Sequence, residues 1–108
     1  MAQQKSLELR SQELQSTFEE LLESREVYYN PPASVRMSYP AIVFNRSKIG
    51  NTFANNSVYR QTHRYEVTVI DEDPDSKYVE KVSKLPMCTH DRAFVSGNLY
   101  HNVFTLYH

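Results

Sequence analysis

The hydrophobic residues near the start of the chain follow the period of an α-helix. From Lys5 to Glu26 they recur at three-, four- and seven-residue intervals, and no glycine or proline interrupts the run. One apolar stripe on a polar rod has to be buried, and we expect it to pack on a sheet rather than form a coiled coil, because the run is short and Leu9 breaks the pattern. We therefore predict an amphipathic N-terminal helix within residues 1–26, its stripe made of Leu7, Leu14, Phe18, Leu21 and Leu22.

Apolar stretches further along the chain predict strands. Residues 39–44 form the first clear strand, and residues 58–71 form the longest. In the longest one, apolar and polar side chains alternate, which is typical of an antiparallel strand with one solvated face. Residues 27–29 predict only a short extended piece, because two prolines follow closely.

The last third of the chain predicts a short helix followed by a hairpin. Pro74-Asp75-Ser76 favours a helix start, and the helix is expected to end at Leu85, because the next residue is a proline. Ser96-Gly97-Asn98 is a tight-turn signal between two apolar stretches, at 89–95 and 99–106. These two stretches are therefore expected to pair as a β-hairpin.

Residues 45–57 are polar and contain four residues that favour turns. We predict a long polar loop there, and a loop of this length often has a function. The turn-favouring residues are Gly50, Asn51, Asn55 and Asn56.

The order of these elements predicts an α+β fold. We expect a mostly antiparallel sheet of about four strands, with the long N-terminal helix and the shorter second helix packed on one face. The 108 residues fit a single domain, residues 1–108, because a second domain would have too few residues for a core of its own.

Composition narrows the class of protein. Hydrophobic residues make up 40% of the chain, as in globular proteins, and eight tyrosines suit protein interfaces, because the side chain is apolar with a polar tip. The single cysteine, Cys88, excludes an internal disulfide and a multi-cysteine zinc site. No apolar run is long enough to span a membrane, and the first residues do not resemble a signal peptide, so we expect a cytoplasmic protein.

Charge is distributed unevenly although the net charge is only −1. Residues 1–30 carry three basic and six acidic side chains, and residues 71–108 carry four basic and six acidic ones. Residues 31–70 carry five basic side chains and one acidic one. In a ring of copies, an acidic segment of one copy would face the basic segment of the next; alternatively, both are simply solvated surfaces.

The histidines and the cysteine do not form a convincing site. The four histidines have no metal-binding spacing, although His63 and His101 lie in predicted strands that are able to meet across a sheet. Cys88 and His90 are two residues apart and share a strand face, but a nucleophilic cysteine also needs an orienting group and an oxyanion hole. We interpret them as ordinary strand or interface residues and expect no metal and no cofactor.

The acidic cluster around Asp75 invites comparison with metal-dependent nucleases, because Asp75 and Lys77 match the spacing of a carboxylate-and-lysine pair in one such class. That pair normally lies on a strand, where alternate residues point the same way. Here it falls at a predicted helix start, where acidic residues favour the helix electrostatically. We therefore expect no enzymatic activity.

The basic middle segment is a candidate surface for nucleic acid. Arginines and a lysine alternate there with aromatic residues, which suits a single strand of DNA or RNA. The slightly negative net charge argues against this function, so a small nucleic-acid-binding module remains an alternative.

Three stretches together resemble the small tail-terminator, or tail-completion, proteins of long-tailed bacteriophages. They are Tyr39-Pro40-Ala41-Ile42-Val43-Phe44, Tyr65-Glu66-Val67-Thr68-Val69-Ile70-Asp71 leading into Pro74-Asp75-Ser76, and Asn98-Leu99-Tyr100-His101; Val27-Tyr28 and Pro31-Pro32 precede them in the same order. The resemblance covers residues 27–108, and the N-terminal helix agrees with it in position.

This resemblance implies a structural protein of the virion with no catalytic residues. Such proteins form rings, usually hexamers, that cap the tail tube, halt its polymerisation and join it to the head connector, with DNA at most passing through the lumen. A head-side neck adaptor, also a ring, is the nearest alternative. The candidate residues for contacts around the ring or along its lumen are Arg36, Arg46, Lys48, Asn51, Phe53, Arg60 and Arg64, with Glu19, Glu20 and Glu23 as acidic partners on the next subunit.

Overall fold

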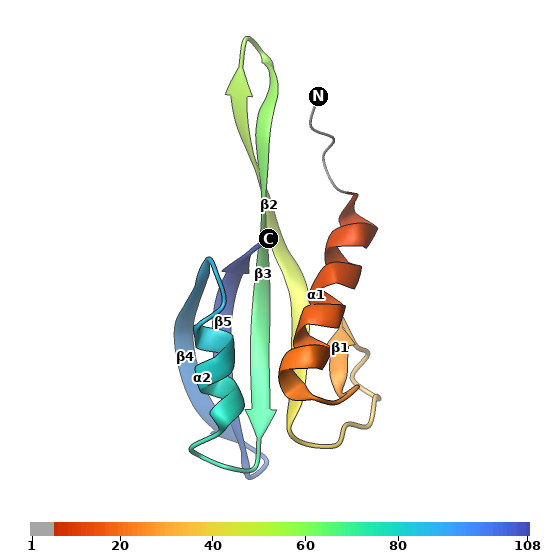
Figure 1. Ribbon diagram of the computed structural model, residues 1–108, viewed down its shortest axis with the longest axis vertical. Coiled ribbons are helices and arrows are strands. Elements are labelled where there is room, and N and C mark those ends of the chain that lie inside the picture. Colours follow the sequence, from red (N-terminus) through yellow and green to blue (C-terminus); the bar gives the residue numbers. More distant parts are fainter. Residues whose placement is uncertain (1–5) are drawn as a thin grey trace.

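The computed structural model describes residues 6–108, apart from the side chain of Tyr59, and has the expected α+β fold. Five strands form one sheet in the order β1-β2-β3-β5-β4, and both helices cover the same face of it (Figure 1). The elements are α1 (Leu7–Leu22), β1 (Val27–Tyr29), β2 (Ala41–Ala54), β3 (Ser57–Asp71), α2 (Lys77–Ser83), β4 (Cys88–Ser96) and β5 (Leu99–Tyr107).

Helix α1 has clear signals at both of its ends. At the start, the Ser6 hydroxyl accepts a hydrogen bond from the backbone N–H of Leu9 at 3.1 Å. At the other end Glu23 adopts a left-handed conformation, with φ of 56°, so the helix ends at Leu22 and does not reach Glu26. The expected helix within residues 1–26 is therefore confirmed over 7–22, and its first five residues lie outside the described part of the chain.

The sheet has one strand more than the four or so expected. Residues 27–29, predicted only as a short extended piece, pair in parallel with β2, and Val27 lies opposite Ile42. All other strand pairs are antiparallel, including the predicted hairpin of β4 and β5. The second predicted helix is confirmed as α2, with Ser76 as its N-cap.

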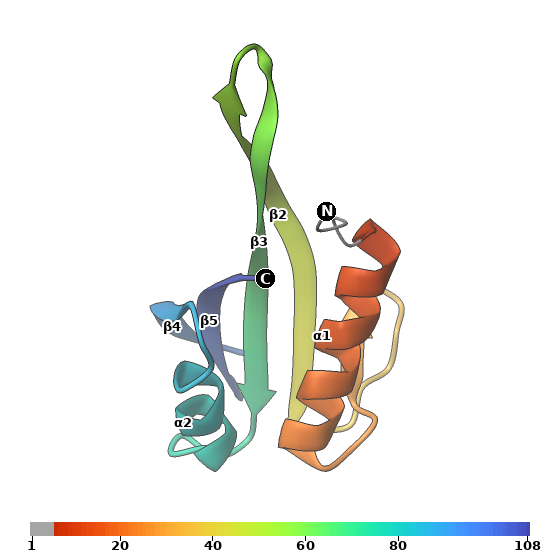
Figure 2. The same ribbon diagram turned by 45° about the horizontal axis from the view of Figure 1, so that its top comes forward.

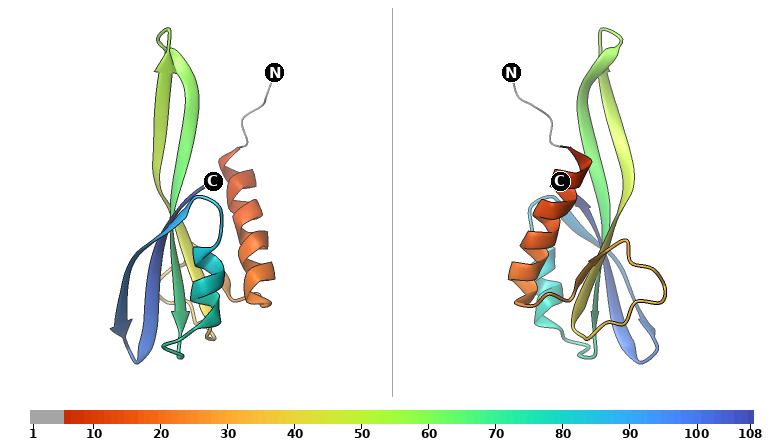
Figure 3. Two further views of the ribbon diagram at one scale, coloured as in Figure 1. Left: turned by 60° about the vertical axis from the view of Figure 1, so that its left-hand side comes forward. Right: turned by 90° about the vertical axis from the view of Figure 1, so that its right-hand side faces the viewer.

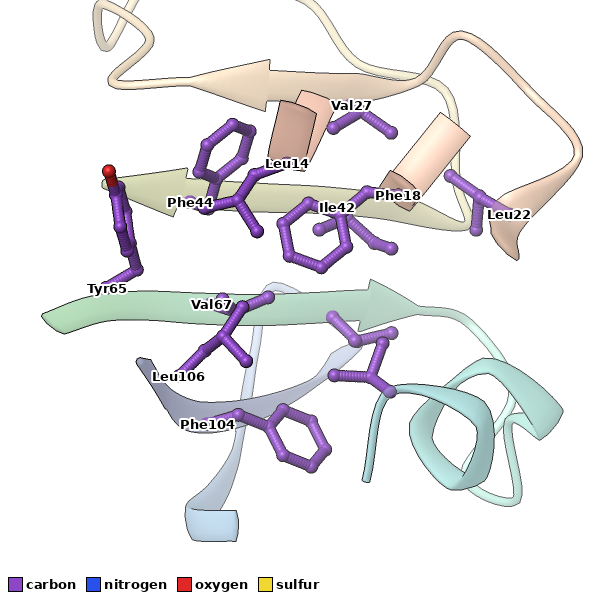
Figure 4. Close-up of a cluster of buried hydrophobic side chains, with 12 residues drawn as sticks. Leu14, Phe18, Leu22, Val27, Ile42, Phe44, Tyr65, Val67, Phe104 and Leu106 are labelled. Atoms are coloured by element: carbon purple, nitrogen blue, oxygen red, sulfur yellow. The ribbon is translucent and has the colours of Figure 1, made fainter. Parts of the chain in front are cut away.

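The hydrophobic core lies between the helices and the sheet. Phe18 from α1 meets Phe44 from β2 edge to face, with ring centroids 5.2 Å apart (Figure 4). Alternate residues of β3 and β5 point into the same layer, and Val67 and Phe104 are fully buried there. The apolar stripe of α1 packs on the sheet through Leu14, Phe18 and Leu22, and Leu21 is partly buried beside them. Leu7, which was also placed in the stripe, is 43% exposed at the start of the helix.

The expected long polar loop at residues 45–57 is wrong. Strand β2 continues to Ala54 and β3 begins at Ser57, so these residues belong to a long hairpin. Asn55 and Asn56 make its turn, both with positive φ, which asparagine tolerates better than most residues. The sequence did not predict these strands. Their side chains are exposed on both faces, so apolar and polar residues do not alternate along them.

The other face of the sheet, which we call the open face, has no helix on it. Figure 3 shows that the segment between β1 and β2 crosses this side, away from α1 and α2. The Glu26 carboxylate accepts hydrogen bonds from the Tyr28 hydroxyl and from the backbone N–H of Ser38. The second of these hydrogen bonds holds the segment in place. These two hydrogen bonds lower the pKa of Glu26. The segment therefore overhangs the open face.

Candidate functional site

The most unusual part of the molecule is the arm, which we define as residues 48–63. Pairing of β3 with β5 ends at Arg64, and pairing of β2 with β1 covers only residues 42–44, so the arm is a ribbon of two strands without a third. Strands rise about 3.3 Å per residue, so residues 48–55 reach roughly 25 Å. The arm accounts for the elongated shape of the molecule, 51 × 24 × 23 Å (Figure 2).

The two faces of the arm differ in chemistry. Strand pairing places Ile49 on the helix side, opposite His63, and Phe53 next to Val58. These apolar side chains are exposed, Phe53 to 65% of its surface. The opposite face carries Lys48 and Arg60. The arm thus has an apolar face and a basic face.

The base of the arm is a β-bulge that turns it out of the sheet. The bulge lies at Ser47, between the pairs Arg46–Tyr65 and Lys48–Arg64. The Arg64 side chain donates to the Ser47 hydroxyl at 3.0 Å, which fixes the bulge from the basic side. Arg46 points the other way, with its guanidinium over the Tyr65 ring at 5.7 Å and a hydrogen bond to the carbonyl of Leu7 at 3.5 Å.

The structure brings together some of the predicted interface residues and separates others. Lys48, Arg60 and Arg64 share the basic face, and Asn51 and Phe53 lie on the apolar face of the same ribbon. The remaining candidates lie elsewhere: Arg46 is held against its own helix, Arg36 is exposed in the segment between β1 and β2, and Glu19, Glu20 and Glu23 lie at the C-terminal end of α1.

A second candidate surface is the groove, a hollow of about 430 Å³ on the open face beneath residues 31–39. Its apolar lining comes from that segment and from four strands of the sheet, β2, β3, β4 and β5. Phe94, which is 44% exposed, forms one wall. Its ring stacks on that of His101, with ring centroids 4.7 Å apart. The apolar side chains of the lining include Pro31, Val35, Met37, Val43, Phe94 and Val103.

The sequence did not single out the groove or two of the three apolar side chains of the arm. Ile49 stands in the stretch that was predicted as a polar loop, and Val58 begins the predicted strand 58–71. Phe94 stands in a strand with an exposed outer edge. The signal that was available is alternation: Phe94 and Arg92 share one face of β4, and a large apolar side chain on a solvated face marks an interaction surface.

The histidine pair considered from the sequence does not form. His63 lies opposite Ile49 and faces the helices, whereas His101 lies opposite Ile70 and faces the groove. The described residues contain no group of three histidine, cysteine or acidic side chains that would suit a metal ion.

The two other sequence candidates for chemistry also lack a supporting geometry. Burial raises the pKa of the Cys88 thiol, and the nearby Asp91 carboxylate raises it further, which is the opposite of what a nucleophile needs. Asp75 lies in an exposed turn before α2, where its backbone N–H donates to the Asp73 carboxylate at 2.8 Å. Asp75 therefore does not share a strand face with Lys77, because Lys77 is the first residue of α2.

Lowering the pH from about 7 to about 5 is expected to destabilise the fold through His63. This side chain is 2% exposed, and burial, together with the positive charges of Arg10, Arg46 and His108, keeps its pKa below the ordinary value of 6.5. Near and below pH 6.5 the unfolded chain therefore binds more protons than the folded chain. The free energy of unfolding falls as the pH drops toward the folded-state pKa.

Urea unfolding at a series of pH values measures this effect. The variant His63→Gln removes the titrating group, so its free energy of unfolding should fall less steeply over the same pH range. An equally steep decline in the variant and the natural chain would contradict the assignment to His63.

No helix among residues 6–108 is both long and apolar enough to cross a membrane. Comparisons of the chain with family models, with curated proteins and with solved structures found no match. The case for a function therefore depends on the surfaces described above and on the sequence stretches quoted earlier.

Proposed function

We propose that this protein is a structural subunit of a bacteriophage tail-terminator ring, which caps the tail tube and joins it to the head connector. The observation that carries the proposal is the arm, with an apolar face and a basic face. A two-stranded ribbon alone is at best marginally stable in water, so such an arm is expected to gain stability by binding a neighbour.

Charge supports a neighbour of the same kind. The chain has no acidic residue between Arg46 and Arg64, whereas the end of α1 carries Glu19, Glu20 and Glu23. An arm bound to a different part of the next copy makes a head-to-tail contact, and such contacts give a ring when the rotation between copies closes. Complementary charge guides and orients this kind of association.

Within the ring, Arg60 and Arg64 of one copy would face Glu20 and Glu23 of the next. Arg36 is the third basic candidate for the same acidic surface. The α+β fold agrees with what the sequence resemblance implies. Members of the family that the chain resembles usually form hexamers. We propose assembly in the host cytoplasm, a place in the neck of the virion, and no enzymatic role.

Electron microscopy of phage particles assembled without this protein tests the proposal. We expect tails of uncontrolled length, detached from heads, because the tube would lack both its stop and its joint. Tails of normal length that fail to join heads would favour a head-side neck adaptor. Normal virions would remove both roles.

One observation favours a different function, binding of nucleic acid by the arm. A two-stranded ribbon fits the major groove of DNA, and residues 46–64 carry four arginine or lysine side chains and no acidic one. DNA binding that weakens steeply with added salt, and that is lost in Arg60→Ala, would favour this function over the ring.

A further inference from the structure

We infer that a small tetrahedral oxyanion such as phosphate binds in a basic pocket at the base of the arm, between the first turns of α1 and the end of β5. The pocket has a volume of about 200 Å³ and lies beside the C-terminal end of the chain (Figures 1 and 3). Arg10, Arg60, His63 and His108 contribute to its lining. We call it the basic pocket, and the inference does not depend on the proposed ring.

The charge of the basic pocket favours an anion as its ligand. Its lining contains two guanidinium groups and two imidazole rings, and no aspartate or glutamate is among its described residues. The Glu13 carboxylate lies 2.9 Å from the ring of His108 and offsets part of this charge, but one carboxylate does not balance two guanidinium groups. Guanidinium groups match the oxygens of phosphate in geometry as well as in sign.

The buried side chain of His63 is independent evidence for a polar ligand. It is 2% exposed, and neither of its ring nitrogens has a hydrogen-bond partner in the described part of the chain. The Nε atom of Arg46 and the hydroxyl of Tyr65, on the same side of the sheet, also lack partners there. Buried polar groups in proteins nearly always have a hydrogen-bond partner, so this cluster indicates a place that accepts a polar ligand.

The donors of the basic pocket come from different elements. The Nη1 atom of Arg10, on α1, donates to the backbone carbonyl of His108 at 2.7 Å, which holds the guanidinium at the pocket. Strand β5 ends beside His63, so the edge of β3 is open next to the pocket. A tetrahedral oxyanion, whose oxygens point to all sides, suits donors that approach from several elements better than a planar carboxylate does.

The size of the basic pocket limits the ligand to a small one. Its volume corresponds to about six water molecules, at about 30 Å³ each, so one phosphate ion fits. Pockets for drug-sized ligands are larger, at about 300–1,000 Å³. Charge and size together therefore select a single oxyanion.

The pKa of His63 supplies a readout for an anion in the basic pocket. Burial lowers this pKa, and the positive charges of Arg10, Arg46 and His108 lower it further. A bound anion adds a negative charge close to the ring, so it should raise the pKa. The other titratable or charged groups of the pocket and its surroundings are Glu13 on α1, Arg60 and Tyr65 on β3, and Tyr107 on β5.

Isothermal titration calorimetry with inorganic phosphate measures binding directly. Arg10→Gln and Arg60→Gln should each weaken phosphate binding about tenfold, because each removes a charge-assisted hydrogen bond. Arg60 is exposed, so its replacement should leave the fold intact, and circular dichroism checks that both variants are folded. The matched control Arg36→Gln removes the same group from an exposed position outside the pocket and should bind phosphate like the natural chain.

The second measurement follows the ring signals of His63 by NMR from about pH 5 to about pH 8. Sulfate is the probe, because its charge does not change over this range, and sodium chloride at the same ionic strength controls for screening. We expect the pKa of His63 to be about one unit higher in sulfate than in chloride, and this difference to shrink in Arg10→Gln.

Two results would overturn the inference. One is a natural chain that binds phosphate no more tightly than Arg10→Gln and Arg60→Gln do, and the other is an equal pKa of His63 in sulfate and in chloride. A short DNA duplex then distinguishes two sources of the phosphate group, both of which support the site. A duplex that displaces bound phosphate supplies the group from its backbone, and one that does not leaves the free ion as the ligand.

Discussion

Replacing Phe44 with alanine is expected to lower the free energy of unfolding by about 3–5 kcal/mol. Phe44 is fully buried, and its ring contacts those of Phe18, Tyr29 and Tyr65, with centroids 5.2, 4.9 and 6.4 Å away. The substitution removes apolar surface from the core and leaves a cavity between α1 and β2. A loss of this size approaches the whole stability of a small domain, which is about 5–15 kcal/mol.

Urea unfolding followed by circular dichroism measures the change. The matched control is Phe53→Ala, the same substitution at a side chain that is 65% exposed on the arm, which should change the free energy of unfolding by less than about 0.5 kcal/mol. If both substitutions cost the same, the core does not lie where the structure places it. If Phe53→Ala also impairs association, the arm contributes to binding rather than to folding.

Removing the arm is expected to abolish assembly and to preserve the fold. In this variant Asn-Gly replaces residues 50–62, so that the paired residues Ile49 and His63 flank a two-residue hairpin turn. The buried core residues all lie outside the deleted segment, so the free energy of unfolding should change by less than about 1 kcal/mol. Self-association should weaken about 100-fold or more, because Phe53, Val58 and Arg60 are lost.

Sedimentation velocity and thermal unfolding together measure this outcome. The control variant replaces only Asn55-Asn56 with Asn-Gly, which keeps the arm and its turn and should assemble normally. An armless chain that still forms the natural oligomer would show that the ring contact lies elsewhere. An armless chain that no longer folds would show that the arm supports the core, which the structure does not suggest.

Much of the fold followed from local patterns. The stripe of α1 and the alternation in β3 each repeat over many residues, and each matches the face that the structure buries. The turn at Gly97-Asn98, with positive φ at both residues, is encoded by the residues themselves. These features were predictable because each one depends on neighbours in the sequence.

The candidate site was predicted only in part, and Arg46 shows why. The basic residues of the middle segment were predicted as a group, and Lys48, Arg60 and Arg64 share one face. Arg46 belongs to the same stretch, but it continues the alternation of Phe44 and lies on the helix side, against Tyr65. The bulge at Ser47 then places Lys48 on the opposite face. A bulge shifts the alternation of side chains between the two faces by one residue, and the local composition does not predict where a bulge occurs.

The sequence by itself determined which segments are helical, where the turn between β4 and β5 falls and which residues are apolar enough to form a core, because these properties act over a few neighbouring residues. Only the tertiary structure decided that residues 27–29 join β2 in parallel, that residues 45–57 form an exposed ribbon, and that a groove opens beneath residues 31–39. Each of these depends on partners far away in the chain, and a stretch exposed on both faces carries no periodic pattern of burial.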